Sequence, residues 1–278
     1  MLKTQKGKTM EKRRIILICL SVIFLGVAVY SGVQVIIGLK DYKKGEEAYN
    51  ELNQYVQIEA PTPSVPETDE KEEDKQEEDS RQNSEAEPEE SWPVVDFEAL
   101  HKICPDVIGW IYVKDTGINY PMVQSEDNNY YLRRLIDGTN NKSGTIFMDY
   151  RNDPEFKNRH TIIYGHNMRN DTMFAHITKY KDQSYYEQHP YCLIVTPTEK
   201  YKINFFSGYV ANLKEDSWKL SFGSEEEYAE WLRVAVEKSN FKSDFEPTVE
   251  DKVVTLSTCS YEFTNARYVL VGVIEKIS

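Results

Sequence analysis

The chain has 278 residues and a formal net charge of −13, of which −11 comes from 14 acidic and three basic residues between Glu59 and Ser91. The remainder is nearly neutral, and no basic patch interleaved with aromatic residues indicates a nucleic-acid partner. The four cysteines, Cys19, Cys104, Cys192 and Cys259, are too few and too irregularly spaced for a disulfide-stapled domain, which leaves a pairing of Cys104 with Cys192 open but favours free thiols.

An apolar run dominates the N-terminal region. Residues 15–39 contain no Asp, Glu, Lys, Arg or His, and as a helix these 25 residues would span about 37 Å, enough to cross a bilayer core of roughly 30 Å. Six basic residues and one acid precede the run. We therefore expect a cytoplasmic N-terminus over residues 1–14, an uncleaved transmembrane anchor over Ile15 to Leu39, and everything after it outside the cell. The alternative, a cleaved signal peptide, has a shorter apolar core and a clearer cleavage site.

The segment over residues 40–91 reads as an extracellular stalk. Helical periodicity is visible from Gly45 to Ile58, and then four prolines and the repelling acids predict a disordered linker that holds the following domain away from the cell surface.

A single folded domain is expected over residues 92–278. Val94 to Ile103 reads as a helix with Asp96 as its N-cap, Asn170 to Lys179 looks helical, and Glu225 to Lys238 is an amphipathic helix capped by Ser224. Short β-branched and apolar runs between these helices predict strands over residues 107–113, 118–123, 144–148, 161–164, 191–196 and 200–212. Many short strands with few helices indicate a mainly β domain, a closed barrel with helical additions.

The C-terminal region carries the most informative motif. Thr-Leu-Ser-Thr-Cys ends at Cys259, and Arg267 follows eight residues later at the start of another apolar run, Tyr268 to Ile274. The seven residues between Cys259 and Arg267 are short enough for a hairpin, which would bring thiol and guanidinium to one sheet edge. A thiolate attacks carbonyls and a fixed cation stabilises the resulting oxyanion, so the pair suits acyl transfer.

His166 is the candidate proton carrier, because it follows a β-branched run in Thr161-Ile162-Ile163-Tyr164-Gly165-His166-Asn167. The other histidines, His101, His160, His176 and His189, are expected on the surface or in packing. No pair of them has metal-ligand spacing on a predicted helix, so we expect no metal and no cofactor.

Taken in order, Tyr-Gly-His-Asn, Thr-Leu-Ser-Thr-Cys and an arginine opening the last strand resemble the sortase family, the membrane-anchored cysteine transpeptidases of Gram-positive bacteria. The Gly144 to Asn152 stretch and the long insertion from about Ser217 to Val249 resemble class B. The resemblance covers roughly Phe97 to Ser278 and implies an eight-stranded barrel.

The resemblance also implies residue roles and partners. Cys259 would be the nucleophile, Arg267 the oxyanion ligand and His166 the acid and base, while Asn128, Leu132 and Ser257 match positions that line the peptide groove. A bland reading of Asn128 and Leu132, as part of a capped turn over the core, stays open. The substrate would be an exported protein with a C-terminal sorting motif, cleaved after its Thr and transferred through a thioester to a peptidoglycan amine.

Four other functions are weighed from the residues alone. An exported, membrane-anchored cysteine endopeptidase would use the same Cys/His pair, although papain-type sequence around Cys259 is absent, and a pilin-polymerising sortase would use another protein as the amine. An L,D-transpeptidase lacks its Ser-x-Gly-Cys signature here. A tethered binding module would leave Cys259 no more reactive than an ordinary thiol.

Overall fold

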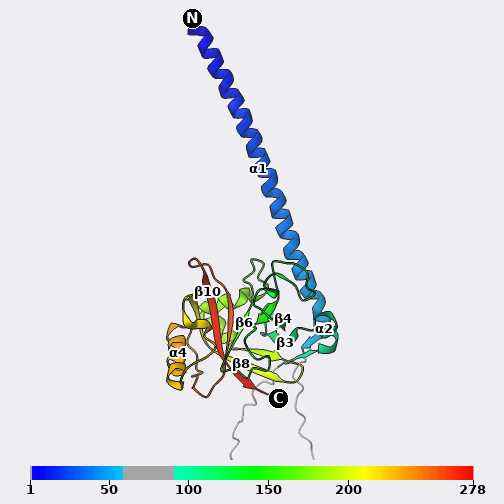
Figure 1. Cartoon of the computed structure of the whole chain (residues 1–278), viewed down its shortest axis with the longest axis vertical. Helices are drawn as coiled ribbons and strands as arrows, with labels where there is room; N and C mark the ends of the chain where they lie inside the picture. Colours follow the sequence, from blue (N-terminus) through cyan, green and yellow to red (C-terminus); the bar gives the residue numbers. More distant parts are fainter. Residues whose placement is uncertain (1, 59–90, 278) are drawn as a thin grey trace, which may run out of the picture.

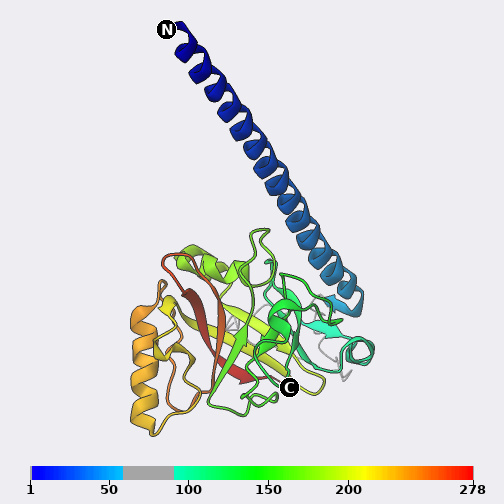
Figure 2. The same ribbon diagram turned by 45° about the horizontal axis from the view of Figure 1, so that its top comes forward.

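The computed structural model describes residues 2–58 and 91–277, without side chains before residue 16. Eight strands form a closed barrel in the order β10-β8-β7-β3-β4-β5-β6-β9, as expected from the sequence. Figures 1 and 2 show this barrel with a long helix projecting from one side. The strands are β3 (Val107–Tyr112), β4 (Asn119–Val123), β5 (Ile146–Met148), β6 (His160–Tyr164), β7 (Tyr191–Val195), β8 (Lys200–Asn212), β9 (Val253–Cys259) and β10 (Ala266–Lys276).

Two neighbouring pairs in the barrel are parallel, β4 with β5 and β6 with β9, and the other pairs are antiparallel. Parallel neighbours end at the same edge of a sheet. The β6–β9 pair therefore places the ends of two strands that are far apart in sequence beside one another.

The continuous apolar runs of β9 and β10 are explained by burial on both faces. Val254, Leu256 and Leu270 pack in the main core, whereas Val253 and Val269 pack in a second cluster under helix α4 (Glu225–Lys238). Strands covered on both faces lose the apolar–polar alternation of half-exposed ones. Helix α4 and its Ser224 cap agree with the prediction, and it is amphipathic for the same reason.

The smaller elements differ in detail from the expectation. Asp96 caps α2 as predicted, but α2 covers only Phe97–Ile103, because Val94 belongs to strand β2 (Pro93–Val95). The helical stretch expected from Asn170 is a 3-10 helix, η3 (Phe174–Lys181), followed by α3 (Gln183–Gln188). Short 3-10 turns complete the chain: η1 (Asn53–Tyr55), η2 (Tyr131–Arg133) and η4 (Asp216–Trp218).

The N-terminal helix corrects two expectations. Helix α1 runs unbroken over Leu2–Leu52, so the apolar run and the following periodic segment form one rod rather than an anchor and a separate stalk helix. Its last turns enter the domain, where Tyr49 and Leu52 are buried in the main core. The described residues contain one helix long and apolar enough to cross a membrane, and it is this one.

Strand β1 (Val56–Ile58) pairs antiparallel with β2, with Ile58 opposite Pro93. The folded domain therefore begins well before Trp92, where the sequence placed it, because residues 49–58 are part of its core and sheet structure. The predicted disordered linker falls on residues 59–90, outside the described residues.

Candidate active site

Cys259 and Arg267 face one another across the C-terminal hairpin. Cys259 is the last residue of β9, Arg267 is the second of β10, and the two are direct antiparallel partners. The turn closes through a hydrogen bond from Ser260 N to Ala266 O (3.0 Å) and contains Asn265 at φ 64°, a conformation that asparagine tolerates. The sequence prediction of thiol and guanidinium at one sheet edge is confirmed.

His166 reaches the same edge through the parallel pairing of β6 with β9. Tyr164 is the partner of Ser257, and two residues further along each chain lie His166 and Cys259. Two hydrogen bonds fix the crossing, from Gly165 N to Ser257 O (3.1 Å) and from Thr258 Oγ1 to Gly165 O (2.7 Å). The proposed base therefore sits beside the proposed nucleophile because of strand register.

Gly165 is required at this crossing by close packing. A Cβ at this position would lie 2.5 Å from Ile146 Cδ1 and 2.6 Å from the ring of Phe174. Real Cβ atoms do not approach other heavy atoms so closely, so a larger residue would push the His166 loop away from β9. Asn167 then holds the loop to the nucleophile's backbone, since its Nδ2 donates to Cys259 O at 2.9 Å.

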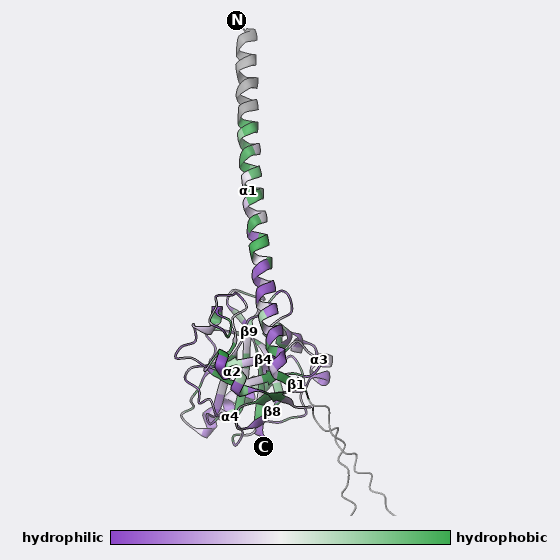
Figure 3. Ribbon diagram, turned by 90° about the vertical axis from the view of Figure 1, so that its right-hand side faces the viewer, coloured by the Kyte–Doolittle hydropathy of each residue, from purple (hydrophilic) through white to green (hydrophobic). Residues whose placement is uncertain are grey.

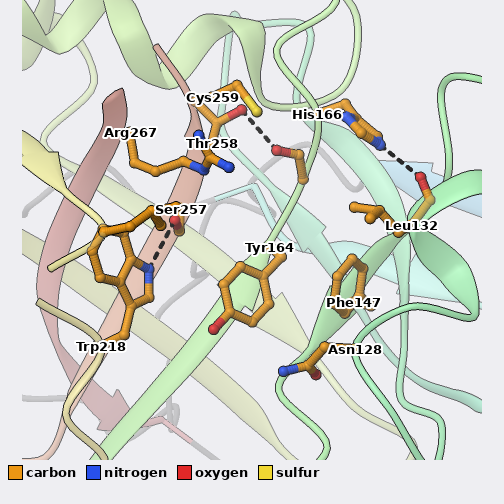
Figure 4. A pocket seen from close by; sticks show the side chains of 12 residues that line it. Asn128, Leu132, Phe147, Tyr164, His166, Trp218, Ser257, Thr258, Cys259 and Arg267 are labelled. Atoms are coloured by element: carbon orange, nitrogen blue, oxygen red, sulfur yellow. Dashed lines mark hydrogen bonds between the residues drawn. The ribbon is translucent and has the colours of Figure 1, made fainter. Parts of the chain in front are cut away.

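The imidazole of His166 is turned toward Leu132, as Figure 4 shows. His166 Nε2 lies 2.6 Å from Leu132 O, and because a carbonyl only accepts, Nε2 carries the proton. Burial lowers the pKa of His166 below its ordinary value, and the nearby charges of Arg133 and Arg267 lower it further, against the opposing effect of the Leu132 contact. The ring is thus neutral at pH 7.

All six residues singled out by the sequence line one pocket of about 280 Å³. Figure 4 shows Cys259 and Arg267 on one side of it and His166 with Leu132 on the other. Its remaining lining residues are Phe147, Tyr164, Gly165, Leu213, Trp218 and Thr258. The exposed apolar side chain of Leu132 and the aromatic walls give the pocket a mainly apolar surface.

Asn128 uses its amide within the protein. Its Nδ2 donates to Asp149 Oδ2 (2.9 Å) and its Oδ1 accepts from Tyr150 N (3.0 Å). Asp149 is fully buried and also accepts from Arg151 Nη2 (2.8 Å) and from Tyr164 OH (3.0 Å). Burial alone would raise the pKa of Asp149, but the hydrogen bonds from Arg151 and Asn128 outweigh it and keep the pKa below its ordinary value. This ionised carboxylate fixes two pocket residues at once.

The sequence missed Asp149 as a site residue, although it lies in the Gly144 to Asn152 stretch that carries the class B resemblance. A buried carboxylate is recognisable only when its partners are known, and Asn128, Arg151 and Tyr164 come from three different segments. The signal in the sequence is that Asp149 is flanked by an apolar and an aromatic residue, but the same pattern is also found in ordinary turns.

Trp218 is a second missed residue, contributed by η4. Its Nε1 donates to Ser257 Oγ (3.1 Å), so it forms a wall of the pocket beside the nucleophile's strand. The next residue, Lys219, is also fixed by a hydrogen bond: its carbonyl accepts from His160 Nδ1 (2.7 Å). His160 Nε2 in turn accepts from Thr255 Oγ1 (2.7 Å). Burial lowers the pKa of His160 to about 4, so this histidine is a neutral packing residue, as the sequence indicated.

The remaining cysteines are free thiols. Cys104 and Cys192 are buried and unpaired, which confirms the favoured prediction, and Cys104 Sγ lies 3.1 Å from Tyr131 OH. Burial raises the pKa of Cys192 far above its ordinary value, so this thiol is unreactive. Cys259 is the partly exposed thiol of the barrel domain. Within residues 2–58 and 91–277, no group of three His, Cys, Asp or Glu side chains could hold a metal ion.

Comparisons with known proteins show which proteins have a similar sequence and fold. The sortase-domain family model matches residues 111–275. Sortase B of Staphylococcus aureus is 37% identical over 184 residues, which are 66% of this chain and 75% of that protein. A crystal structure of the Staphylococcus aureus sortase B–substrate complex superposes with a TM-score of 0.63, at 37% identity and covering 66% of this chain and 85% of that one. A ligand complex of sortase B from B. anthracis gives a TM-score of 0.66, at 31% identity and covering 86% and 100%.

Proposed function

This chain belongs to the sortase family, as a sortase B-type cysteine transpeptidase, and from that premise we propose that Cys259, His166 and Arg267 carry its reaction. The observation that supports this assignment most strongly is strand register. Antiparallel pairing puts Arg267 opposite Cys259, and parallel pairing puts His166 beside Cys259, all lining one pocket.

The first half-reaction forms a thioester. The Cys259 thiolate attacks the backbone carbonyl after the threonine of a sorting motif, and Arg267 hydrogen-bonds the oxyanion. The C–N bond then breaks, and His166, in its imidazolium form, gives its Nε2 proton to the departing amine and becomes neutral. Substrate must therefore replace the Leu132 carbonyl as the partner of that proton.

The second half-reaction regenerates the thiolate. An amine, in this proposal one from peptidoglycan, attacks the thioester carbonyl, Cys259 leaves as thiolate, and His166 accepts the proton of the attacking nitrogen. Arg267 again stabilises the oxyanion. Because the pKa of His166 is lowered, its protonated form is the minor one at pH 7, and the rate should depend on that fraction.

The substrate groove is the pocket lined by Asn128, Leu132 and Ser257. Leu132 offers apolar surface, Ser257 Oγ is held in place by Trp218, and the Asn128 amide is held in place by Asp149. Fixed polar groups in an apolar pocket suit the recognition of an extended peptide. The named Staphylococcus aureus relative was crystallised with a substrate, which supports a peptide in the corresponding groove here.

The cellular placement follows from α1. We infer that Ile15 to Leu39 anchor the protein as a single-pass membrane protein, with residues 1–14 in the cytoplasm and the catalytic domain outside. The length and hydropathy of the helix support this placement. The domain boundary then lies at the end of the apolar run rather than at Trp92.

Intact-protein mass spectrometry with a panel of sorting-motif peptides tests the mechanism. A mass gain equal to the N-terminal part of one peptide, absent in Cys259→Ala and released by an added amine, would establish the thioester. The reactive peptide would also identify the motif.

Two alternatives give different results in the same experiment. Cleavage of peptides without adduct or amine transfer would instead support a cysteine endopeptidase. Transfer to a lysine of a partner protein in preference to a peptidoglycan-like amine would support pilin polymerisation. Absence of any adduct, together with ordinary thiol reactivity of Cys259, would contradict the catalytic assignment.

A further inference from the structure

Helix α1 joins the barrel directly at the end of its apolar run. Asp41 is two residues beyond Leu39, about 3 Å further along the helix axis. The backbone carbonyl of Asp41 already accepts from Asn141 Nδ2 (2.9 Å), and its carboxylate accepts from Lys142 N (3.2 Å). The loop carrying Asn141 and Lys142 therefore lies at the level where the apolar run stops.

The joint is also rigid. A Cβ on Gly45 would lie 2.6 Å from Ser143 Oγ, so helix and loop approach as closely as a glycine allows. One turn further, Tyr49 OH donates to Gly144 O (2.5 Å), and its ring packs edge-on against Tyr120 at 5.3 Å. Contacts on successive turns fix the direction of α1 relative to the barrel, with no flexible segment between them.

The end of the barrel that faces along α1 toward the apolar run is the catalytic end. Figure 1 shows α1 leaving past the end where β10 begins, while the C-terminus lies at the opposite end. Strands β6 and β9 also terminate there, with His166 and Cys259. Figure 3 shows that the hydrophobic part of α1 stops just before the helix reaches this end of the domain.

This end carries side chains suited to an anionic lipid surface. Lys40, Lys44, Lys142 and Arg169 are exposed, and none forms an ion pair with another described residue. Three acids there are each paired with a lysine, Glu47 with Lys43, Asp171 with Lys179 and Glu262 with Lys181, while Glu46 is unpaired and the Asp41 carboxylate accepts from the backbone N of Lys142.

The tip of the β9–β10 hairpin adds exposed aromatic side chains, with Tyr261 75% and Phe263 46% exposed. Basic residues attract anionic headgroups and aromatic residues favour the membrane–water interface. The side chains of Tyr261 and Phe263 are not needed to close the hairpin, because backbone hydrogen bonds hold it.

We propose that the catalytic end of the barrel is seated on an anionic bilayer surface, with the pocket mouth at headgroup level. This inference rests on the proposed anchor, because α1 sets the height and the tilt. A substrate held in the same bilayer by an apolar segment would then reach Cys259 along the membrane plane. The surface that contacts lipid comprises the 141–143 loop, Arg169 and the hairpin tip at 261–263.

Site-specific photo-crosslinking of the full chain in vesicles containing phosphatidylglycerol tests this seating. A photoreactive amino acid is placed at Lys142, at Phe263 or, as the control, at Thr198, an exposed residue in the β7–β8 turn near the C-terminal end of β10. None of the three lines the pocket. We expect lipid adducts at Lys142 and Phe263 several-fold above those at Thr198, and fewer adducts in vesicles of zwitterionic lipid alone.

A flexible Gly/Ser segment about 12 residues long, inserted between Lys40 and Asp41, provides the matched variant. It keeps the anchor but frees the domain, so adducts at Lys142 and Phe263 should fall toward the Thr198 level. Flotation of the vesicles after an alkaline wash reports the anchor separately. If the parent chain floats but gives no excess adducts at Lys142, the seating alone is overturned, and if the parent chain does not float, the anchor and the seating are overturned together. The thioester assay on peptides is independent of both results.

Discussion

Arg267 combines a permanent charge with free hydrogen-bonding capacity beside the nucleophile. One of its guanidinium nitrogens donates to Ala266 O at 3.0 Å, and this is the hydrogen bond its side chain makes with the described residues. A guanidinium has five N–H donors, so most remain available to an oxygen at the pocket mouth. The charge and the donors suit an oxyanion that exists only in the transition state.

Replacing this arginine should therefore slow the chemistry and leave the fold intact. One oxyanion donor is worth on the order of 3 kcal/mol, so Arg267→Ala should lower kcat/KM for peptide and amine by about a hundredfold or more. Cys259→Ala should abolish the reaction. Steady-state transfer assays check both, and comparable activity in Arg267→Ala would refute the oxyanion role.

Burial is the main cause of the lowered pKa of His166, and the charges of Arg133 and Arg267 lower it further and can be removed singly. Arg133 lowers the pKa of His166 by disfavouring a second positive charge nearby. In Arg133→Gln the pKa of His166 should rise toward its ordinary value of about 6.5, and the limb of the pH–rate profile that reports His166 should move to higher pH. An NMR titration of the imidazole measures the shift directly. Arg169→Gln, a change at another exposed arginine, is the control and should leave the titration unchanged; a lowered or unmoved pKa in Arg133→Gln would contradict this account.

At the scale of elements, the end of α1 and strand β1 belong to the catalytic domain. Tyr49, Leu52 and Val56 are buried, and β1 pairs with β2. A buried apolar side chain of this size contributes about 1.5–3 kcal/mol. Tyr49 OH hydrogen-bonds Gly144 O and Thr145 Oγ1 in the 141–145 loop, and Gly144 lies against the backbone of Leu132, the hydrogen-bonding partner of His166.

A soluble domain that begins at residue 41 should therefore be more stable than one that begins at Trp92, by several kcal/mol. Urea unfolding of the two proteins measures the difference. Tyr49→Phe in the longer protein should cost only about 1 kcal/mol, because it removes the hydroxyl and keeps the ring. Equal unfolding midpoints for the long and short proteins would show that the contacts of α1 with the barrel do not stabilise the domain.

At the scale of the whole molecule, most of the net charge lies in one segment of the sequence, outside the strands of the barrel. The acidic stretch that carries most of the net charge leaves the domain at Ile58 and returns at the paired Pro93. Because Ile58 and Pro93 are partners and α1 joins the domain before this stretch, the proposed anchor assigns the distance between bilayer and pocket to α1 and not to the acidic stretch.

Replacing residues 59–92 by a turn of about four residues should consequently preserve activity. Loop-closure entropy favours the shorter connection, by up to about 2 kcal/mol, so the free energy of unfolding should not fall. Peptide transfer rates and lipid adducts at Lys142 should match those of the parent chain. Loss of transfer with an unchanged unfolding midpoint would assign the acidic stretch a direct role in the reaction.

The sequence by itself determined the features that depend on near neighbours in the chain. The eight strands, the Asp96 and Ser224 caps, the hairpin that joins Cys259 to Arg267 and the apolar run of α1 are encoded by local periodicity and turn length. A β-branched run ending before His166 also marked this histidine, and the family resemblance added the groove residues Asn128, Leu132 and Ser257, which the pocket brings together with it.

Only the tertiary structure decided the contacts between distant segments. The parallel pairing of β6 with β9, the carboxylate of Asp149 under Asn128 and the placement of Trp218 over Ser257 each join residues many positions apart. The docking of α1 is of the same kind: periodicity predicts its helix, but its buried turns are recognisable only against the loop that covers them. Local sequence patterns do not identify such partners, because these contacts contribute free energy only when both distant segments are folded.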